Sequence, residues 1–368
     1  MMANDAPGSS LYRLVAEYGG FEHHRTGTEH ERETQAWLGD HLTDRGAVVR
    51  TATYDFDQFV VAEHHVTLDG EAVEAMPLWY AGAGHHDTSD VDRIVWPFAG
   101  GNHGTDDAWA SLIGTRPTVA ATAGLDGKLG VPNRAPRFTL DQPVSLIAGS
   151  FAEQLLEADV RVVADFHRTT GESVNVFGRF GGESASPLVI TTPMTGWFAC
   201  AGERGTGIAI AIELATRLGG ERPVLFVGTT GHEIGYLGVD RLVNEAGFGT
   251  PAAIVHIGAS TAAGVVLDGE GTLSPTRLAL SSLPAADGRA VVDAAADGGL
   301  NVLENPPDWF GEGEMLKRLD VPLLSFVGTF PDFHTPLDVV ERVTTPSMLA
   351  DASATVEHTV RAFLDAAG

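Results

Sequence analysis

The most constraining feature of the sequence is a regular alternation of short apolar runs and helical segments from residue 186 onward. The apolar runs are rich in Val, Leu, Ile and Phe, which is typical of strands buried on both faces. Strands that alternate with helices build a mostly parallel sheet covered by helices on both faces, so we expect an α/β fold. The strands are expected at 187–192, 223–228, 252–257 and 322–327, and the helices at 206–218, 236–245, 286–297, 313–319 and 346–366.

The first half of the chain has a different character. Residues 10–45 have a helical pattern, and residues 48–61 alternate as a strand does. Between residues 63 and 168, short β-like runs are broken by Gly, Pro and Asp, which favours a small β-rich domain. We therefore predict one α/β domain formed by residues 1–62 and 169–368, with residues 63–168 inserted into it.

The charge balance excludes several classes of partner. Acidic residues outnumber basic ones by 49 to 23 in this chain of 368 residues, and the formal net charge is −26. Such a surface repels nucleic-acid phosphates and anionic lipids, and no apolar stretch approaches the roughly 20 residues that span a bilayer. Cys200 is the sole cysteine, which excludes an internal disulfide and favours a reducing cytoplasm. We expect a cytoplasmic protein that acts on a small molecule or short peptide.

Ionisable side chains gather where the predicted strands end. Glu203 follows the first predicted strand of the sheet, in a glycine-rich loop that leads into a helix. His232 and Glu233 follow the second strand, His256 lies in the third, and His334 follows the last. Because ligands of open α/β sheets bind at the carboxyl ends of the strands, these residues are expected to converge on one rim.

Two roles suit these residues. Glu203, Glu233 and His334 offer carboxylate and imidazole ligands that suit a divalent ion, usually zinc, and we predict that they hold one ion. His232 and His256 are the predicted acid–base residues, since imidazole titrates near neutral pH. Two simpler interpretations stay open: Glu203 can interact with the helix N-terminus, and His256 can be a hydrogen-bonded core residue.

Other polar residues have plainer interpretations. Glu312 and Glu314 precede a helix and either interact with its N-terminus or contact a substrate amine. Cys200 is interpreted as a small buried thiol, because no activating neighbour is visible. Three pairs of adjacent histidines lack ligand spacing and are expected at the surface, at residues 23–24, 64–65 and 85–86.

Several motifs occur in an order that resembles the zinc aminopeptidases of the bacterial leucyl aminopeptidase and glutamate carboxypeptidase kind. The motifs are residues 24–29 (HRTGTE), 173–178 (SVNVFG), 205–207 (GTG), 233–238 (EIGYLG) and 334–338 (HTPLD). The resemblance covers almost the whole chain. It implies that the β-rich middle segment corresponds to the protease-associated insert of that family.

The resemblance also shows where this chain departs from the family, whose members bind two metal ions bridged by an Asp and use a Glu as general base. Residues 193–197, where a His and an Asp ligand are expected, contain neither. Glu203 stands at the place of the bridging Asp, His232 at that of the catalytic Glu, and His256 near that of a third acidic ligand. Glu233 and His334 match outright. The related glutaminyl cyclases hold a single zinc with two acidic residues and a histidine, and Glu203, Glu233 and His334 are similar to that set.

Three functions remain open. The first is a mono-metal hydrolase or acyl-transfer enzyme on a small amide or amine-bearing substrate. The second is a metal-independent lyase, isomerase or cyclase that uses His232, His256 and His334, and the third is a binding protein that keeps the fold without its chemistry. Four aromatic residues are the expected pocket walls: Trp197, Phe198, Trp309 and Phe310.

Overall fold

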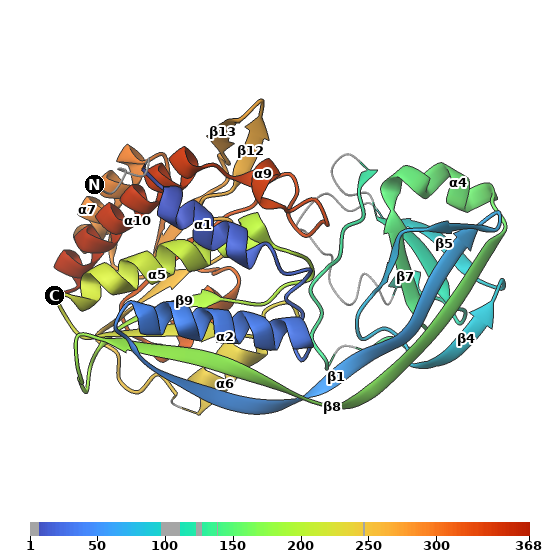
Figure 1. The fold of residues 1–368 in the computed structure, drawn as a ribbon, viewed down its shortest axis with the longest axis horizontal. Coiled ribbons are helices and arrows are strands. Elements are labelled where there is room, and N and C mark those ends of the chain that lie inside the picture. Colours follow the sequence, from blue (N-terminus) through green and yellow to red (C-terminus); the bar gives the residue numbers. More distant parts are fainter. Residues whose placement is uncertain (1–6, 97–110, 123–126, 138, 246) are drawn as a thin grey trace.

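The computed structural model describes residues 7–96, 111–122, 127–137, 139–245 and 247–368. They form an α/β body joined to a smaller β-rich part by a ribbon of two long antiparallel strands, β1 (Val48–Leu68) and β8 (Val160–Phe180) (Figure 1). Within the described residues, no helix combines the length and the apolar character needed to cross a membrane.

A large mixed sheet is the centre of the α/β body, with strand order β15-β14-β16-β11-β9-β10-β8-β1-β2. The four strands expected from the apolar runs are its parallel centre, because β9 pairs in parallel with β10 and β11, and β11 with β16. Strands β8 and β14 pair antiparallel on either side. The strands of the body are β9 (Leu188–Pro193), β10 (Val224–Thr229), β11 (Ala253–Ile257), β14 (Leu278–Ser281), β15 (Asn301–Glu304) and β16 (Leu323–Val327), with a separate hairpin of β12 (Gly264–Leu267) and β13 (Glu270–Leu273).

Helices cover both faces of the sheet, as predicted. Alternate residues of β10 face opposite cores: Val224 and Phe226 pack with one cluster, Leu225 and Val227 with the other. The first cluster includes buried residues of α1 (Ser9–Tyr18), α2 (Glu29–Asp44), α5 (Thr206–Gly219), α7 (Ala285–Asp297) and α10 (Pro346–Ala367). The second includes residues of α6 (Leu237–Asn244) and α8 (Glu312–Leu316), and a short α9 (Val340–Val343) precedes α10.

The predicted helical stretch 10–45 is two helices, which corrects the sequence interpretation. Helix α1 ends at Tyr18, followed by Gly19 and Gly20, and α2 begins after Thr28. The Thr28 side chain caps α2 by accepting a hydrogen bond from the backbone N–H of Glu31. The loop between the helices carries residues 24–27 to the carboxyl edge of the sheet, where His24 forms an isolated bridge with Gly196.

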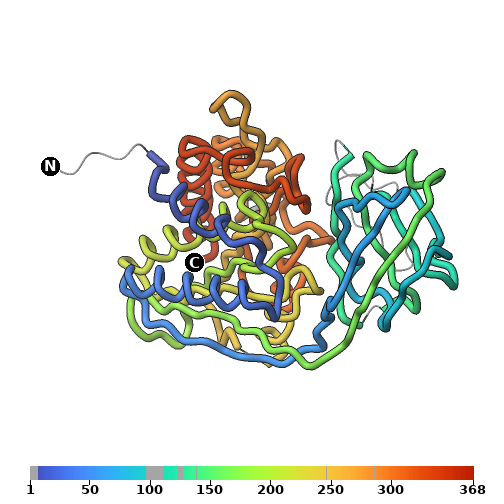
Figure 2. The backbone as a smooth tube through the Cα atoms, turned by 45° about the vertical axis from the view of Figure 1, so that its right-hand side comes forward, coloured from blue at the N-terminus to red at the C-terminus, as the bar shows by residue number. Residues whose placement is uncertain are grey.

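The β-rich part has a core of its own, made of residues from Tyr54 to Phe166 together with Trp197 and Ile234. The predicted boundaries at residues 62/63 and 168/169 lie inside β1 and β8, which continue through both parts (Figure 2). The remaining elements here are β2 (Glu71–Val73), β4 (Gly84–Thr88), α4 (Ala152–Glu157) and a four-stranded sheet in the order β3 (Ala75–Pro77), β7 (Val144–Ala148), β6 (Thr118–Thr122) and β5 (Asp92–Trp96).

Candidate functional site

A cavity of about 410 Å³ lies at the carboxyl edge of the parallel strands. It is lined by three of the predicted site residues, His232, His256 and His334, so the structure brings these strand ends together as expected. Tyr236 and Asn133 add polar groups to the lining, which is completed by Gly258, Ala259, Thr276, Leu278, Phe310, Gly311, Val327, Gly328, Thr329 and Phe333.

A tight turn after β10 positions His232 and Glu233. Gly231 has φ +73°, and a Cβ there would lie 2.9 Å from Leu237 and from the Tyr54 hydroxyl, so only glycine fits. The backbone N–H of His232 donates to the Thr195 hydroxyl at 3.1 Å, which ties this turn to the loop after β9. The turn therefore fixes the positions of the adjacent residues His232 and Glu233 at the edge of the sheet.

His232 is paired with Glu312, the first residue of α8. The distance from His232 Nδ1 to Glu312 Oε1 is 3.2 Å, and the other Glu312 oxygen accepts from the Thr229 hydroxyl at 2.6 Å. Burial raises the pKa of Glu312 to about 7, although the Thr229 hydrogen bond acts in the opposite direction. The His232 ring also makes an edge contact with Tyr236, at 4.8 Å between centroids.

The sequence did not predict this pair. The sequence predicts for Glu312 a place at a helix N-terminus or a contact to a substrate amine, and Glu312 does begin α8. The sequence does not reveal that the Glu312 carboxyl is fully buried or that it contacts His232, because the two residues are 80 positions apart. The neighbouring Glu314 is exposed and does not line the cavity.

Glu203 lies in a single π-helical turn, Ala201–Gly205, and its carboxylate is held by two neighbours. Its Oε1 is 2.9 Å from His334 Nε2 and 2.6 Å from Arg204 Nη2. Burial alone would raise the pKa of Glu203, but the positive charge of Arg204 and the contact with His334 lower it to about 2. The carboxylate is therefore ionised and already neutralised inside the protein.

Arg204 is a buried cation at this edge of the sheet. Its side chain has no exposed surface, and Nε donates to the Thr195 carbonyl oxygen at 2.9 Å. Burial disfavours its charge, yet the adjacent Glu203 raises the pKa of Arg204 above its ordinary value. The side chain of Arg204 thus brings a permanent positive charge to the carboxylate that was predicted to hold a metal ion.

His334 lies between two hydrogen-bond acceptors. Its Nδ1 is 3.0 Å from the Val131 carbonyl oxygen, and its Nε2 faces the Glu203 carboxylate. Neither partner can donate, so each ring nitrogen makes its hydrogen bond only when it carries a proton.

Glu233 does not meet Glu203 and His334. Its Oε1 accepts from both the backbone N–H and the hydroxyl of Thr26, each at 2.7 Å. The residue lines a second cavity, on the side of the β-rich part, and does not line the one that holds His232. Of the three predicted metal ligands, Glu203 and His334 are therefore in contact, whereas Glu233 binds Thr26 instead.

Among the described residues, the donor atoms of another trio, Cys200, Glu203 and Asp338, lie within 4.8 Å of one another. Burial raises the pKa of the Cys200 thiol well above its ordinary value, and Glu203 and Asp338 raise it further. The Asp338 oxygens accept the backbone N–H groups of Gly202 and Glu203 at 2.6 and 3.0 Å. A neutral thiol, occupied carboxylate oxygens and the nearby Arg204 do not fit a catalytic zinc ion.

His256 combines the two interpretations that were left open. It is buried within β11, where Nδ1 lies 3.1 Å from the hydroxyl of Thr191 on the neighbouring strand. Burial and the charge of Arg204 lower the pKa of His256 to about 3, so the ring is neutral. It is both a hydrogen-bonded core residue and part of the cavity wall.

Some expected surface and wall residues lie elsewhere. His24 is fully buried, stacked on Tyr18 with its Nδ1 2.8 Å from the Thr34 hydroxyl, which corrects its interpretation as a surface residue. Of the expected aromatic walls, Phe310 lines the cavity and Trp197 lines the second cavity. Trp309 packs in the core beneath α8 instead.

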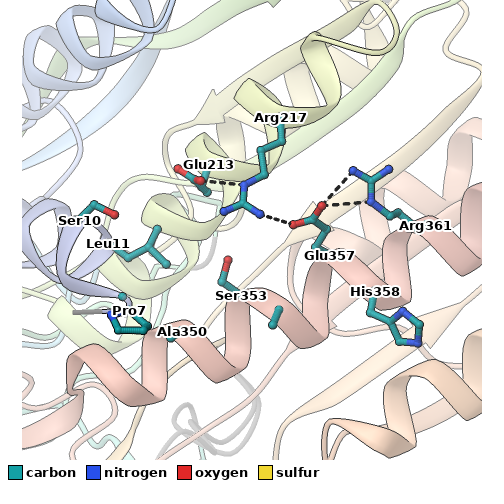
Figure 3. Close-up of a pocket in the computed structure, with 12 residues that line it drawn as sticks. Pro7, Ser10, Leu11, Glu213, Arg217, Ala350, Ser353, Glu357, His358 and Arg361 are labelled. Atoms are coloured by element: carbon teal, nitrogen blue, oxygen red, sulfur yellow. Dashed lines mark hydrogen bonds and ion pairs between the residues drawn. The ribbon is translucent and has the colours of Figure 1, made fainter. Parts of the chain in front are cut away.

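A surface hollow of about 490 Å³ between α1, α5 and α10 is a poor candidate for a site. Its charged side chains pair with one another: Arg217 contacts Glu213 and Glu357, each at 2.8 Å, and Arg361 contacts Glu357 (Figure 3). These side chains already satisfy each other.

No family model and no curated protein matches this sequence, whereas solved structures do. A zinc aminopeptidase from Bacillus subtilis matches with a TM-score of 0.73 at 14% identity, over 98% of this chain and 95% of that chain. This chain has the fold of zinc aminopeptidases. A peptidase M28 precursor from Shewanella amazonensis matches with a TM-score of 0.73 at 15% identity, over 97% and 93% of the two chains. A glutaminyl cyclase from Porphyromonas gingivalis matches with a TM-score of 0.53 at 13% identity, over 99% of each chain.

Proposed function

We propose that this protein is a metal-independent enzyme of the aminopeptidase fold that transfers protons on a small substrate in the cavity lined by His232, His256 and Tyr236. The reaction class is that of a lyase, isomerase or cyclase. The observation that carries the proposal is the contact of 2.6 Å between Arg204 and Glu203. The guanidinium supplies, within the chain, the positive charge that a metal ion would otherwise bring to this carboxylate.

His232 is the acid–base residue of the proposed reaction. Glu312 contacts Nδ1 and so orients the ring at the edge of the cavity. Burial raises the pKa of Glu312 to about 7, which puts its charge change in the range where imidazole also titrates. The carboxyl of Glu312 can therefore gain or lose a proton near neutral pH, beside the imidazole that it holds.

Two neighbouring groups can stabilise charge that develops on the substrate. Burial raises the pKa of Tyr236, and Glu312 raises it further, so the phenol stays protonated and can donate a hydrogen bond. The amide of Asn133, which accepts from Trp197 Nε1 at 3.1 Å, also lines the cavity. These donors suit an oxyanion formed when a proton leaves the carbon beside a carbonyl.

The test is turnover on a panel of small amides, lactams, hydroxy acids and N-terminal glutaminyl peptides, with and without EDTA. We expect turnover that EDTA leaves unchanged and that His232→Gln lowers by about 10²- to 10⁴-fold. His358→Gln, on the exposed face of α10, is the matched control and should behave as the unaltered protein. Loss of turnover in EDTA with recovery in zinc would contradict the proposal.

That last outcome would support the second candidate, a mono-zinc hydrolase or acyl-transfer enzyme. The contact of 2.9 Å between Glu203 and His334 favours it, together with the fold shared with zinc aminopeptidases. It requires Arg204 to leave Glu203 and Glu233 to turn from Thr26. Tight ligand binding without turnover would instead indicate a binding protein.

The proposal extends to the setting of the enzyme. We take the β-rich part as a protease-associated type of insert, supported by its position between β1 and β8 and by its separate core. A small-molecule or short-peptide substrate, and no nucleic-acid or membrane partner, is supported by the net charge of −26. We place the protein in the cytoplasm on the basis of its single cysteine.

A further inference from the structure

A second cavity, of about 540 Å³, lies where the α/β body meets the β-rich part. Arg25, Thr26 and Glu233 reach it from the body, and Trp79 and Tyr80 reach it from the β-rich part. It is separate from the cavity of His232 and plays no part in the function proposed above.

One wall of this second cavity carries an acceptor without a donor. Glu233 is 1% exposed, and its Oε2 has no hydrogen-bond partner among the residues that the structure describes. The other oxygen already accepts two hydrogen bonds from Thr26. A buried carboxylate oxygen left unpaired is costly, and a bound group with N–H donors, above all an ammonium, removes that cost.

The same cavity carries donors without acceptors. Arg25 Nε and Trp79 Nε1 are both buried and lack a partner within the described part of the chain. Arg25 is fixed in place, since its Nη2 lies 2.8 Å from His23 Nε2 and its guanidinium lies 5.2 Å from the centroid of the Trp79 ring. A guanidinium edge beside an indole N–H suits a carboxylate.

The rest of the lining is aromatic and apolar. Trp79 stacks on Trp197 with 5.0 Å between centroids and an interplanar angle of 18°, and Phe59 contacts Trp79 edge-on at 5.7 Å. Ile234 and Tyr80 also line this cavity. Such a wall can pack against a large apolar or aromatic side chain but offers few hydrogen bonds to a small polar one.

We propose that this cavity binds a free α-amino acid with an aromatic or large apolar side chain. The ammonium donates to Glu233 Oε2, the carboxylate accepts from Arg25 Nε and Trp79 Nε1, and the side chain packs against the indole rings. A zwitterion offers a partner of the right kind to each of the three unpaired atoms. Neither an amine nor a carboxylic acid alone does so.

The test is calorimetric titration of the full chain with three probes of one shape: L-phenylalanine, phenethylamine, which lacks the carboxylate, and 3-phenylpropionate, which lacks the ammonium. L-phenylalanine should bind at one site per chain, and each of the other two at least about tenfold more weakly, because hydrogen bonds to charged groups are lost.

Two substitutions should separate the contribution of the ammonium to binding from that of the carboxylate. In Glu233→Gln, L-phenylalanine should bind at least about tenfold more weakly, and its advantage over 3-phenylpropionate should disappear. In Arg25→Gln, its advantage over phenethylamine should disappear. Trp79→Phe, which keeps a ring but removes the N–H, gives a third variant if Glu233→Gln fails to fold. Arg217→Gln and Glu357→Gln, both in the paired surface hollow, are the charge-matched controls and should bind all three probes as the unaltered protein does.

The inference is overturned if L-phenylalanine does not bind at millimolar concentration, or if it binds equally to the unaltered protein and to Glu233→Gln and Arg25→Gln. It is also overturned if His232→Gln abolishes L-phenylalanine binding, since the ligand would then occupy the first cavity. Binding that survives His232→Gln supports the second site whether or not His232 proves to be an acid–base residue.

Discussion

At the scale of single residues, the contact between Arg204 and Glu203 decides what the edge of the sheet can do. The carboxylate is ionised, fully buried and balanced by a guanidinium 2.6 Å away, with His334 on the same oxygen. The sequence located Glu203 and His334 correctly at strand ends, but it gave no sign that Arg204 turns inward. A lysine or arginine in a loop is usually solvated, and only the packing around α5 shows that this one is not.

Removal of Arg204 should be severely destabilising. Arg204→Met leaves Glu203 as an uncompensated buried charge, for which about 3–5 kcal/mol of unfolding free energy is the usual loss. The double variant Glu203→Gln/Arg204→Met removes both charges and should regain part of that loss. Urea unfolding of the two single variants and the double variant measures the coupling. A double variant whose loss equals the sum of the single losses would show that the ion pair is absent.

At the scale of elements, strand positions followed from sequence better than helix ends did. Four buried apolar runs are the four parallel strands, because burial on both faces demands apolar residues at every position. Strands β14 and β15 were missed, since each has only four residues. Strand β1 is longer than expected, because beyond residue 61 it continues through the polar residues Glu63, His64 and His65.

The turn after β10 is the element that orients His232 and Glu233, so it gives a test at this scale. Gly231→Ala should destabilise the protein by about 1–3 kcal/mol, because φ is +73° and the new Cβ meets Leu237 and Tyr54 at 2.9 Å. Gly46→Ala is the control, since φ there is +87° but no atom lies within 4 Å of the added Cβ. Thermal melting should show a larger loss for Gly231→Ala than for Gly46→Ala. Equal losses would mean that backbone strain alone matters and the turn is not tightly packed.

At the scale of the whole molecule, buried titratable groups set the pH dependence of stability. Burial raises the pKa of Glu31 to about 8, of Asp338 to about 8 and of Glu312 to about 7. These carboxyls hold protons in the folded state that the unfolded chain has released, so they contribute stability at low pH that is lost as pH rises through 7 to 8. Burial lowers the pKa of His24 and His256 to about 3, so they contribute stability at high pH that is lost below the unfolded value of about 6.5.

The two sets act in opposite directions below about pH 6.5. Urea unfolding should show that the free energy of unfolding rises as pH falls from 8 to about 6.5, where the carboxyls act alone, and flattens below that, where the histidines oppose them. Glu312→Gln should reduce the rise, because one of the titrating carboxyls is then gone. Stability that increases steadily from pH 6.5 to 8 would contradict the buried, protonated state of these groups.

The α/β fold was within reach of the sequence, since apolar runs and ordered motifs cover almost the whole chain. The side-chain contacts inside the site could not be predicted from the sequence, because they depend on the directions in which neighbouring side chains point. His232 and Glu233 are adjacent in sequence and line different cavities. Pairing of His232 with Glu312 and of Glu233 with Thr26 joins residues 80 and 207 positions apart, which no local pattern reports.

The most direct test of the account is the zinc content of the untagged protein after incubation with excess zinc and removal of the unbound metal by gel filtration. Because Arg204 already neutralises Glu203, we predict far less than one zinc ion per chain by elemental analysis. One tightly held zinc ion per chain, removed by EDTA and retained by His358→Gln but lost in His334→Gln, would contradict the central claim.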